Sequence, residues 1–155
     1  MKHKIITLDP ILGYFEKDLD LRMRNYRATK KRILGEGQKL IDFANGHHFF
    51  GFHKQEDGWV YREWAPGAEN LFVTGDFCNW ERYAYPLTKK ENGVFEVFLP
   101  GENTLYDSCR VLAIVQSGGR ELERIPLYAH RVVQDPESYV WNAVICEEPA
   151  FTWSD

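Results

Sequence analysis

The hydrophobic period of the sequence changes near Gly46, and this change restricts the chain to folds that combine a helical segment with a sheet. Before Gly46, apolar residues recur at helical spacing, as at Leu19, Met23 and Tyr26. After Gly46, short runs rich in β-branched and aromatic residues are each ended by turn residues. We therefore expect residues 1–45 to form a helical leader ahead of a β-rich domain.

The helical leader is predicted to hold one long helix and one short helical turn at residues 38–44. Asp18 or Asp20 is expected to cap the long helix, and Gly35 to end it. Residues 1–39 carry ten Lys/Arg against five Asp/Glu, so this helix either contacts nucleic acid or presents a solvated basic face. We favour the solvated face and no nucleic-acid partner, because the whole chain has a net charge of −4 and no nucleic-acid-binding motif.

Seven short runs after residue 46 are predicted to be strands, and Asn92-Gly93 favours a hairpin between Leu87 and Phe95. The runs are residues 47–53, 58–64, 70–75, 93–99, 109–115, 121–125 and 139–145. Strands of this length and turn spacing predict a mainly β fold, an immunoglobulin-like β-sandwich of about seven strands, preceded by the short α-helical segment. We expect three parts: the leader at 1–45, the sandwich at 46–133, and a last strand with a linker at 134–155.

Several classes of protein are excluded by what the sequence lacks. It has no run of 18 apolar residues, so no membrane span is predicted. Its three cysteines are odd in number and widely spaced, which predicts neither a disulfide framework nor a metal knuckle. A reducing, cytoplasmic setting is therefore expected. Neither a phosphate-binding loop nor a nucleophile elbow occurs, so no cofactor is expected.

Three histidines lie close together in the sequence at His47, His48 and His53. On one strand, His47 and His48 would point to opposite faces, and His47 and His53 would lie about 20 Å apart. We therefore expect no metal site there.

Aromatic residues among polar neighbours are the most informative candidates for a binding site. Trp64 precedes a turn, and Phe77 and Trp80 lie in GDFCNW. An exposed flat ring can stack on a sugar ring, with a contribution of about 0.5–1.5 kcal/mol if the value for aromatic pairs applies. The alternative is that these rings are core residues, which we favour for Phe77.

The motifs YREWAPGA (Tyr61–Ala68) and GDFCNW (Gly75–Trp80) resemble the N-terminal module of 1,4-α-glucan branching enzymes, which belongs to carbohydrate-binding module family 48. The similarity runs along the whole chain. It includes the leader LDPILGYFEKDLDLRMRNY and RIPLYAHRVV at residues 124–133, which is similar to the exit strand of the module. It also includes EEPAFTW at residues 147–153, which is similar to the segment that leads into the catalytic barrel of such enzymes.

The resemblance implies a non-catalytic α-glucan-binding module. In that family, two carboxylates on a glycoside hydrolase family 13 barrel cut an α-1,4-glucan and transfer its end to a 6-hydroxyl. Such a barrel needs about 200 residues or more, so we expect it after Asp155 and expect no catalytic residues in this chain. The implied partners are an α-glucan such as glycogen and the enzyme's own barrel.

The resemblance also suggests site residues. The GDFxxW pattern also occurs in the glycogen-binding domain of AMP-activated kinase β subunits. Trp64 matches the first tryptophan of that kinase-type glycogen site by its place before a turn, and Arg110 is the nearest basic residue. That site's second tryptophan has no counterpart here, and Cys78 replaces an asparagine of the GDF motif. The expected carbohydrate-binding residues are Trp64, Asn79, Trp80 and Arg110, and the expected docking residues for the barrel are Trp141, Phe151 and Trp153.

Three functional hypotheses stay open at this point. The first is a glucan-binding module that also docks on the barrel. The second is a purely structural module that positions the barrel and binds no sugar. The third is a stand-alone regulatory subunit that targets a partner to glycogen.

Overall fold

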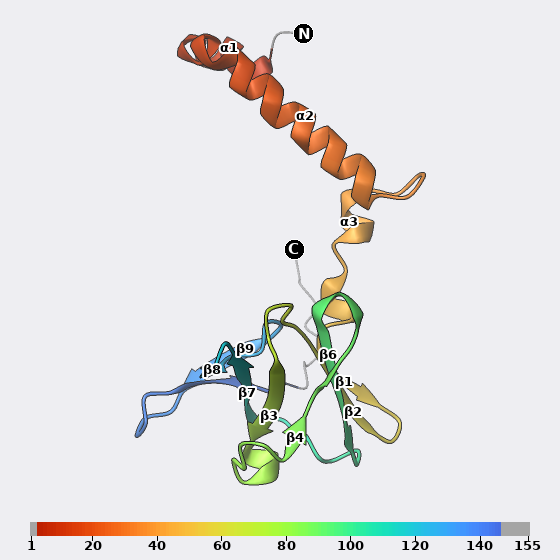
Figure 1. The fold of residues 1–155 in the computed structure, drawn as a ribbon, viewed down its shortest axis with the longest axis vertical. Coiled ribbons are helices and arrows are strands. Elements are labelled where there is room, and N and C mark those ends of the chain that lie inside the picture. Colours follow the sequence, from red (N-terminus) through yellow and green to blue (C-terminus); the bar gives the residue numbers. More distant parts are fainter. Residues whose placement is uncertain (1–2, 147–155) are drawn as a thin grey trace, which may run out of the picture. The chain divides into compact units, whose positions relative to one another are not determined.

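The computed structural model describes residues 3–146, and the chain divides into two compact units, Met1–Gly46 and His47–Asp155. The first unit contains the helices α1 (Lys4–Leu8), η1 (Pro10–Phe15), α2 (Glu16–Ile33) and α3 (Leu40–Phe43). The second unit holds all of the described strands (Figure 1). The two units are treated separately below.

The long basic helix α2 forms as the helical period predicts, but neither expected aspartate caps it. Asp9 instead accepts a hydrogen bond from the backbone N–H of Ile11 at the start of η1, and the chain continues from η1 directly into α2. Phe15 is therefore the N-cap residue of α2, and no side chain caps it. Acidic residues in the first turn and Lys30, Lys31 and Arg32 in the last turn suit the helix dipole.

The second unit is a sandwich of two antiparallel sheets (Figure 1). The four-stranded sheet has the order β1-β2-β6-β5, and the six-stranded sheet has the order β4-β3-β7-β10-β9, with β8 paired to β7. The strands are β1 (Gly51–Gln55), β2 (Gly58–Trp64), β3 (Asn70–Gly75), β4 (Tyr85–Pro86), β5 (Thr88–Lys89), β6 (Val94–Pro100), β7 (Arg110–Ser117), β8 (Arg120–Arg124), β9 (Arg131–Gln134) and β10 (Trp141–Val144). Three short 3-10 helices, η2 (Gly46–His48), η3 (Asp76–Cys78) and η4 (Glu91–Gly93), lie between these elements.

The core lies between the two sheets and follows from the alternation of side chains along each strand. Tyr61 and Phe95 of one sheet are buried with Val73 and Val111 of the other. Full burial of an apolar side chain of this size contributes about 1.5–3 kcal/mol. Phe77 packs against this core, which confirms its assignment as a core residue.

Three details of the prediction differ from the structure. His47 and His48 lie in η2 and not on a strand, and their ring centroids are 3.9 Å apart. The argument that they point to opposite faces was therefore wrong, because the chain enters the sheet only at Gly51. Only the end of the expected exit strand at residues 124–133 is extended as β9, and the two-residue strands β4 and β5 were not predicted, because runs this short give no clear alternation.

One edge of β7 is shared by two strands, and this arrangement exposes part of the inner face of the sheet. β10 pairs with β7 at Arg110 and Val111, whereas β8 pairs with residues 113–117. The paired residues of β7 and β8 share a face, so Leu122 lies on the same side as the core residue Val115. Leu122 is nevertheless 52% exposed, because it lies beyond the apolar cluster that joins the two sheets.

Candidate functional site

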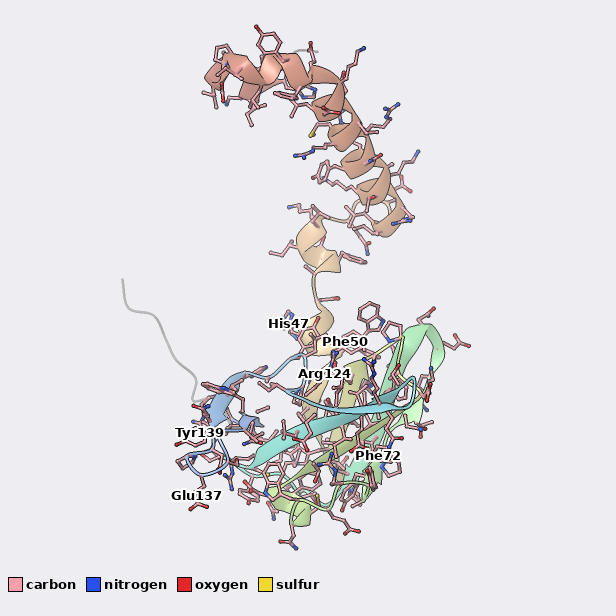
Figure 2. The ribbon with its side chains drawn as sticks, turned by 60° about the vertical axis from the view of Figure 1, so that its left-hand side comes forward. His47, Phe50, Phe72, Arg124, Glu137 and Tyr139 are labelled. Atoms are coloured by element: carbon pink, nitrogen blue, oxygen red, sulfur yellow. The ribbon has the colours of Figure 1, made fainter. Side chains whose placement is uncertain are left out.

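Trp64 and Trp80, the two tryptophans expected to bind sugar, lie at opposite ends of β3. The turn after Trp64 leads into the start of this strand, and Trp80 follows its end. Five residue steps at about 3.3 Å each separate the two ends by roughly 17 Å. The hollow beside Trp64 is lined by neither Trp80 nor Arg110. Figure 2 shows one of its lining residues, Arg124, together with Glu137 and Tyr139 in the loop that follows β9. The structure therefore brings together Trp80 and Arg110 but not Trp64.

The ring of Trp64 is half exposed, at 53%, and is held in a fixed orientation. Its Nε1–H donates a hydrogen bond of 3.0 Å to the backbone oxygen of Asn92, in the hairpin predicted at this position. The next residue, Gly93, has a φ of +78°, and a Cβ there would lie 2.6 Å from Pro66. The close packing of this hairpin against the Pro66 turn thus depends on glycine.

A hollow of about 610 Å³ opens beside Trp64 and is mostly lined by apolar side chains. We call it the Trp64 hollow. One wall is the turn from Trp64 to Ala68, the floor includes Leu71, Ala113 and Val115, and the far wall contains Arg120, Leu122, Arg124, Ile125 and Leu127. The far wall is formed by β8 and the segment that follows it. The four-stranded sheet does not cover this part of the other sheet.

Glu63 joins two walls of the Trp64 hollow. Its side chain is buried, and Oε1 accepts a hydrogen bond from the backbone N–H of Trp64 at 3.1 Å. Oε2 accepts from the hydroxyl of Tyr61 and from the N–H of Leu127, both at 2.8 Å. Burial, together with the nearby charge of Glu63, raises the pKa of Tyr61 well above its usual value, so this hydroxyl stays protonated and donates to Glu63. Through these three hydrogen bonds the carboxylate links β2 to the segment at Leu127.

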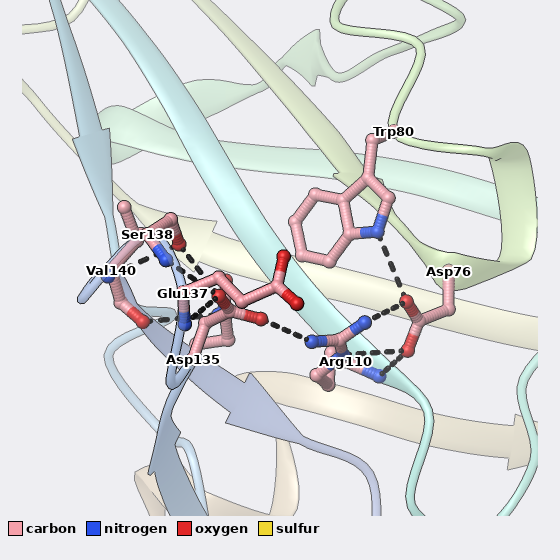
Figure 3. Close-up of polar contacts among 8 residues, drawn as sticks. Asp76, Trp80, Arg110, Asp135, Glu137, Ser138 and Val140 are labelled. Carbon is pink, nitrogen blue, oxygen red and sulfur yellow. Dashed lines mark hydrogen bonds and ion pairs between the residues drawn. The ribbon is translucent and has the colours of Figure 1, made fainter.

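Trp80 is held quite differently, in a group of polar contacts that we call the Trp80 clasp (Figure 3). Its Nε1–H donates to Oδ1 of Asp76 at 3.0 Å, and the guanidinium carbon of Arg110 lies 5.7 Å from the ring centroid. Arg110 in turn donates to both oxygens of Asp76, at 3.1 and 3.2 Å, and to Asp135 at 2.8 Å. The indole N–H and the guanidinium are thus already bonded within the protein.

The charges of the Trp80 clasp stabilise one another. Burial raises the pKa of Asp76, but the hydrogen bonds from Arg110 and Trp80 outweigh burial and hold this pKa below its usual value. The pKa of Asp135 is lowered chiefly by hydrogen bonds from Ser138, with a smaller effect from Arg110. Both carboxylates are therefore ionised at neutral pH, and hydrogen bonds with Asp76 keep Arg110 protonated by raising its pKa.

A smaller hollow of about 250 Å³ lies beside the clasp and contains a residue that the sequence analysis did not select. Asn142 on β10 is 3% exposed, and within residues 3–146 its Oδ1 has no hydrogen-bond partner. A buried carbonyl oxygen without a donor is costly, so it marks a place for a donor from a ligand or water. The available signal was a polar residue inside the apolar run YVWNAVI.

The remaining expected site residues are spread over the surface. Asn79 is exposed, in a left-handed conformation at the end of η3 with φ of 51°. Trp141 is 52% exposed on β10, where it borders a shallow depression with Ile125 and Val140. The two other expected docking residues, Phe151 and Trp153, lie outside the described residues. Over residues 3–146, no three His, Cys, Asp or Glu side chains come together as metal ligands would.

Residues 49–129 match the family model of carbohydrate-binding module 48, described as the isoamylase N-terminal domain. The match covers the whole strand pattern from β1 to β8 and includes both tryptophans. The chain belongs to this family. It is thus a carbohydrate-binding module by family, which confirms the resemblance inferred from the WAPGA and GDFCNW motifs.

The relatives of this family member include 1,4-alpha-glucan-branching enzymes. It is 34% identical to the enzyme of Felis catus, 36% to that of Emericella nidulans, and 32% to the chloroplastic/amyloplastic enzyme 2-2 of Arabidopsis thaliana. These matches cover 94%, 89% and 94% of this chain but only 22%, 22% and 19% of the relatives. The chain therefore spans about a fifth of the length of the curated relatives that it matches.

Solved structures support the fold of this carbohydrate-binding module 48. Pullulanase type I from Bacillus subtilis, solved with maltose, matches with a TM-score of 0.54 at 20% identity, over 83% of this chain and 15% of the pullulanase. The catalytic module of the pneumococcal glycogen-degrading factor SpuA matches with a TM-score of 0.50 at 17% identity, over 79% of this chain and 18% of that module. Within residues 3–146, no helix has the length and apolar character needed to span a membrane.

Proposed function

We propose that this module binds α-glucan chains and that the exposed ring of Trp64 is the centre of its binding site. The observation that carries the proposal is a half-exposed indole, fixed by its hydrogen bond to Asn92, at the mouth of a 610 Å³ hollow. A rigid flat ring loses little conformational entropy when a sugar stacks on it. The family membership and the branching-enzyme relatives support α-glucan as the ligand.

The residues around Trp64 supply what a sugar needs besides a stacking surface. The C–H groups of a glucose ring suit the apolar side chains of Leu122 and Leu127, whereas its hydroxyls need donors and acceptors. The guanidinium groups of Arg120 and Arg124 provide donors on the far wall. The Trp64 hollow thus combines an aromatic platform with polar groups at its rim.

The Trp80 clasp is the second candidate place for a sugar, and the unpartnered Oδ1 of Asn142 is the observation that favours it. A sugar hydroxyl in the 250 Å³ hollow could donate to this oxygen. Against this, the polar groups of Trp80 and Arg110 already have partners, so fewer contacts are left for a ligand. We therefore assign this hollow a minor contribution to binding.

We further propose that the module is the non-catalytic part of a branching enzyme and that it docks on the enzyme's catalytic barrel. The relatives that support this role are about five times as long as the chain. Trp141, Ile125 and Val140 form an exposed apolar surface suited to such a contact. Tethering would raise the local concentration of glucan at the barrel, so weak binding suffices. A cytoplasmic setting belongs to the same proposal.

Affinity electrophoresis in glycogen-containing gels tests whether the module binds glucan. We expect the 155-residue chain to migrate more slowly with glycogen than without it, and Trp64→Ala to restore most of its mobility. Phe98→Ala is the matched control, because Phe98 is nearly as exposed as Trp64 and is not among the residues that line the hollow. Unchanged migration of the wild-type chain would favour the purely structural module. A stand-alone regulatory subunit would be supported by a transcript that ends after residue 155.

A further inference from the structure

The far wall of the Trp64 hollow carries two arginines that face the proposed sugar site. Arg124 pairs across the strands with Ala113, and Leu122 pairs with Val115, so these β8 residues share the face that lines the hollow. Arg120 lies two residues before Leu122 and has the same orientation, because strand side chains alternate. Arg120 and Arg124 are about 13 Å apart along the strand and thus occupy different positions beside a bound chain.

The acidic residues of β8 do not neutralise these arginines, because they lie on the opposite face. Arg82 bonds to Glu121 at 2.6 Å and also to Glu123. Glu121 accepts further bonds from Gln116 and Tyr83. The hydrogen bonds from Gln116 and Arg82 lower the pKa of Glu121 to about 2, so it stays ionised and bound on its own side.

The hollow itself offers the two arginines no free carboxylate. Glu63, which lines the hollow, already accepts three hydrogen bonds from Tyr61, Trp64 and Leu127. Across residues 3–146, the guanidinium groups of Arg120 and Arg124 take part in no hydrogen bond or ion pair. Two guanidinium groups without anionic partners therefore border a site that already contains a stacking ring.

We propose that the Trp64 hollow prefers α-glucan that carries phosphate monoesters. This inference rests on the proposed function and names its substrate more closely. Arg120 and Arg124 bind the phosphate while a glucose of the same chain stacks on Trp64. Guanidinium groups match phosphate oxygens with two parallel hydrogen bonds, which a neutral hydroxyl cannot offer.

The test compares one glucan with and without its phosphate. Phosphate-bearing amylopectin is divided in two, and one half is treated with a phosphatase, so that chain lengths and branching stay the same. We expect the untreated half to bind the wild-type chain at least five-fold more tightly in low-salt buffer. The doubly substituted Arg120→Gln/Arg124→Gln chain should bind both halves equally, and no more tightly than the wild type binds the treated half.

Two controls make the outcome specific. Arg22→Gln/Arg24→Gln removes the same charge from α2 and should keep the preference for phosphate. Inorganic phosphate, added at the concentration of glucan-bound phosphate, should compete poorly. Equal binding of both halves by the wild type would overturn the inference while leaving the proposed function intact, and no binding of either half would overturn both. Loss of the preference in the α2 variant, or strong competition by inorganic phosphate, would also contradict it.

Discussion

Trp64 and Trp80 mark two ends of one strand and show two uses of the same side chain. At the first end, the indole N–H bonds to a backbone oxygen, and the ring stands free beside an apolar hollow. At the second end, the indole N–H bonds to a carboxylate, and an arginine between two carboxylates lies near the ring. The comparison teaches that a tryptophan beside a turn becomes a binding surface only when its polar neighbours leave its face free.

The largest effect is expected from a substitution that breaks the Trp80 clasp. Arg110→Gln removes the ion pairs to Asp76 and Asp135 and leaves the partly buried Asp76 without its cation. We expect a loss of about 2 kcal/mol in the free energy of unfolding at pH 7, less than for a fully buried pair. Urea denaturation measures this loss. Arg131→Gln, which removes one bond to Ser108, should cost under about 0.5 kcal/mol, and an equal loss in both variants would argue against the clasp.

The pH dependence of the same variant separates the ion pair from simple packing. The folded pKa of Asp76 is depressed, so its contribution is fully present above the usual pKa of 3.8 and is lost as the pH falls through the lower folded value. Without Arg110 most of this depression disappears. The stability difference between wild type and Arg110→Gln should therefore be constant from pH 7 to 5 and shrink below about pH 4. A stability difference of the same size at pH 3 would show that it does not come from the ion pair between Asp76 and Arg110.

Removal of the free ring is expected to weaken binding with little cost in stability. Trp64→Ala should weaken the binding of maltoheptaose about ten-fold or more, or about 1.4 kcal/mol, which lies within the range for stacking on an aromatic side chain. Isothermal titration calorimetry measures the affinity. The melting temperature should change little, because the ring is half exposed. Arg110→Gln, measured under conditions in which it is folded, should bind maltoheptaose within two-fold of the wild-type affinity. A larger loss would mean that the glucan binds at the Trp80 end of β3.

The smallest expected effect concerns the hollow beside the clasp. Asn142→Leu removes the buried unpartnered oxygen and the hydrogen bond of Nδ2 to Val140. We expect the affinity for maltoheptaose to fall less than three-fold, since this hollow makes only a minor contribution. The same calorimetric titration checks it. A ten-fold loss would show that the glucan lies at the Trp80 end and that Trp64 is secondary.

Much of the fold could be predicted from the sequence, because β2 and β3 are regular alternating runs between clear turn residues. The leader helix was also predictable, although its start was not, because η1 continues directly into α2. The site was harder. Asp76 and Arg110 are 34 residues apart, and nothing local in GDFCNW indicates that Trp80 will lie beside this ion pair. The spacing of residues in the sequence could not show which tryptophan ring stands free and which one is held by polar neighbours.

The central claim is that the glucan contacts Trp64 and not Trp80, and it is tested most directly by observing both indole rings in one sample. In a ¹⁵N-labelled chain, each tryptophan gives an indole N–H signal in the NMR spectrum, and Trp64→Phe and Trp80→Phe identify the two signals of interest. Titration with maltoheptaose should shift the Trp64 signal progressively to saturation and leave the Trp80 signal in place. A saturable shift of the Trp80 signal with an unmoved Trp64 signal would contradict the account.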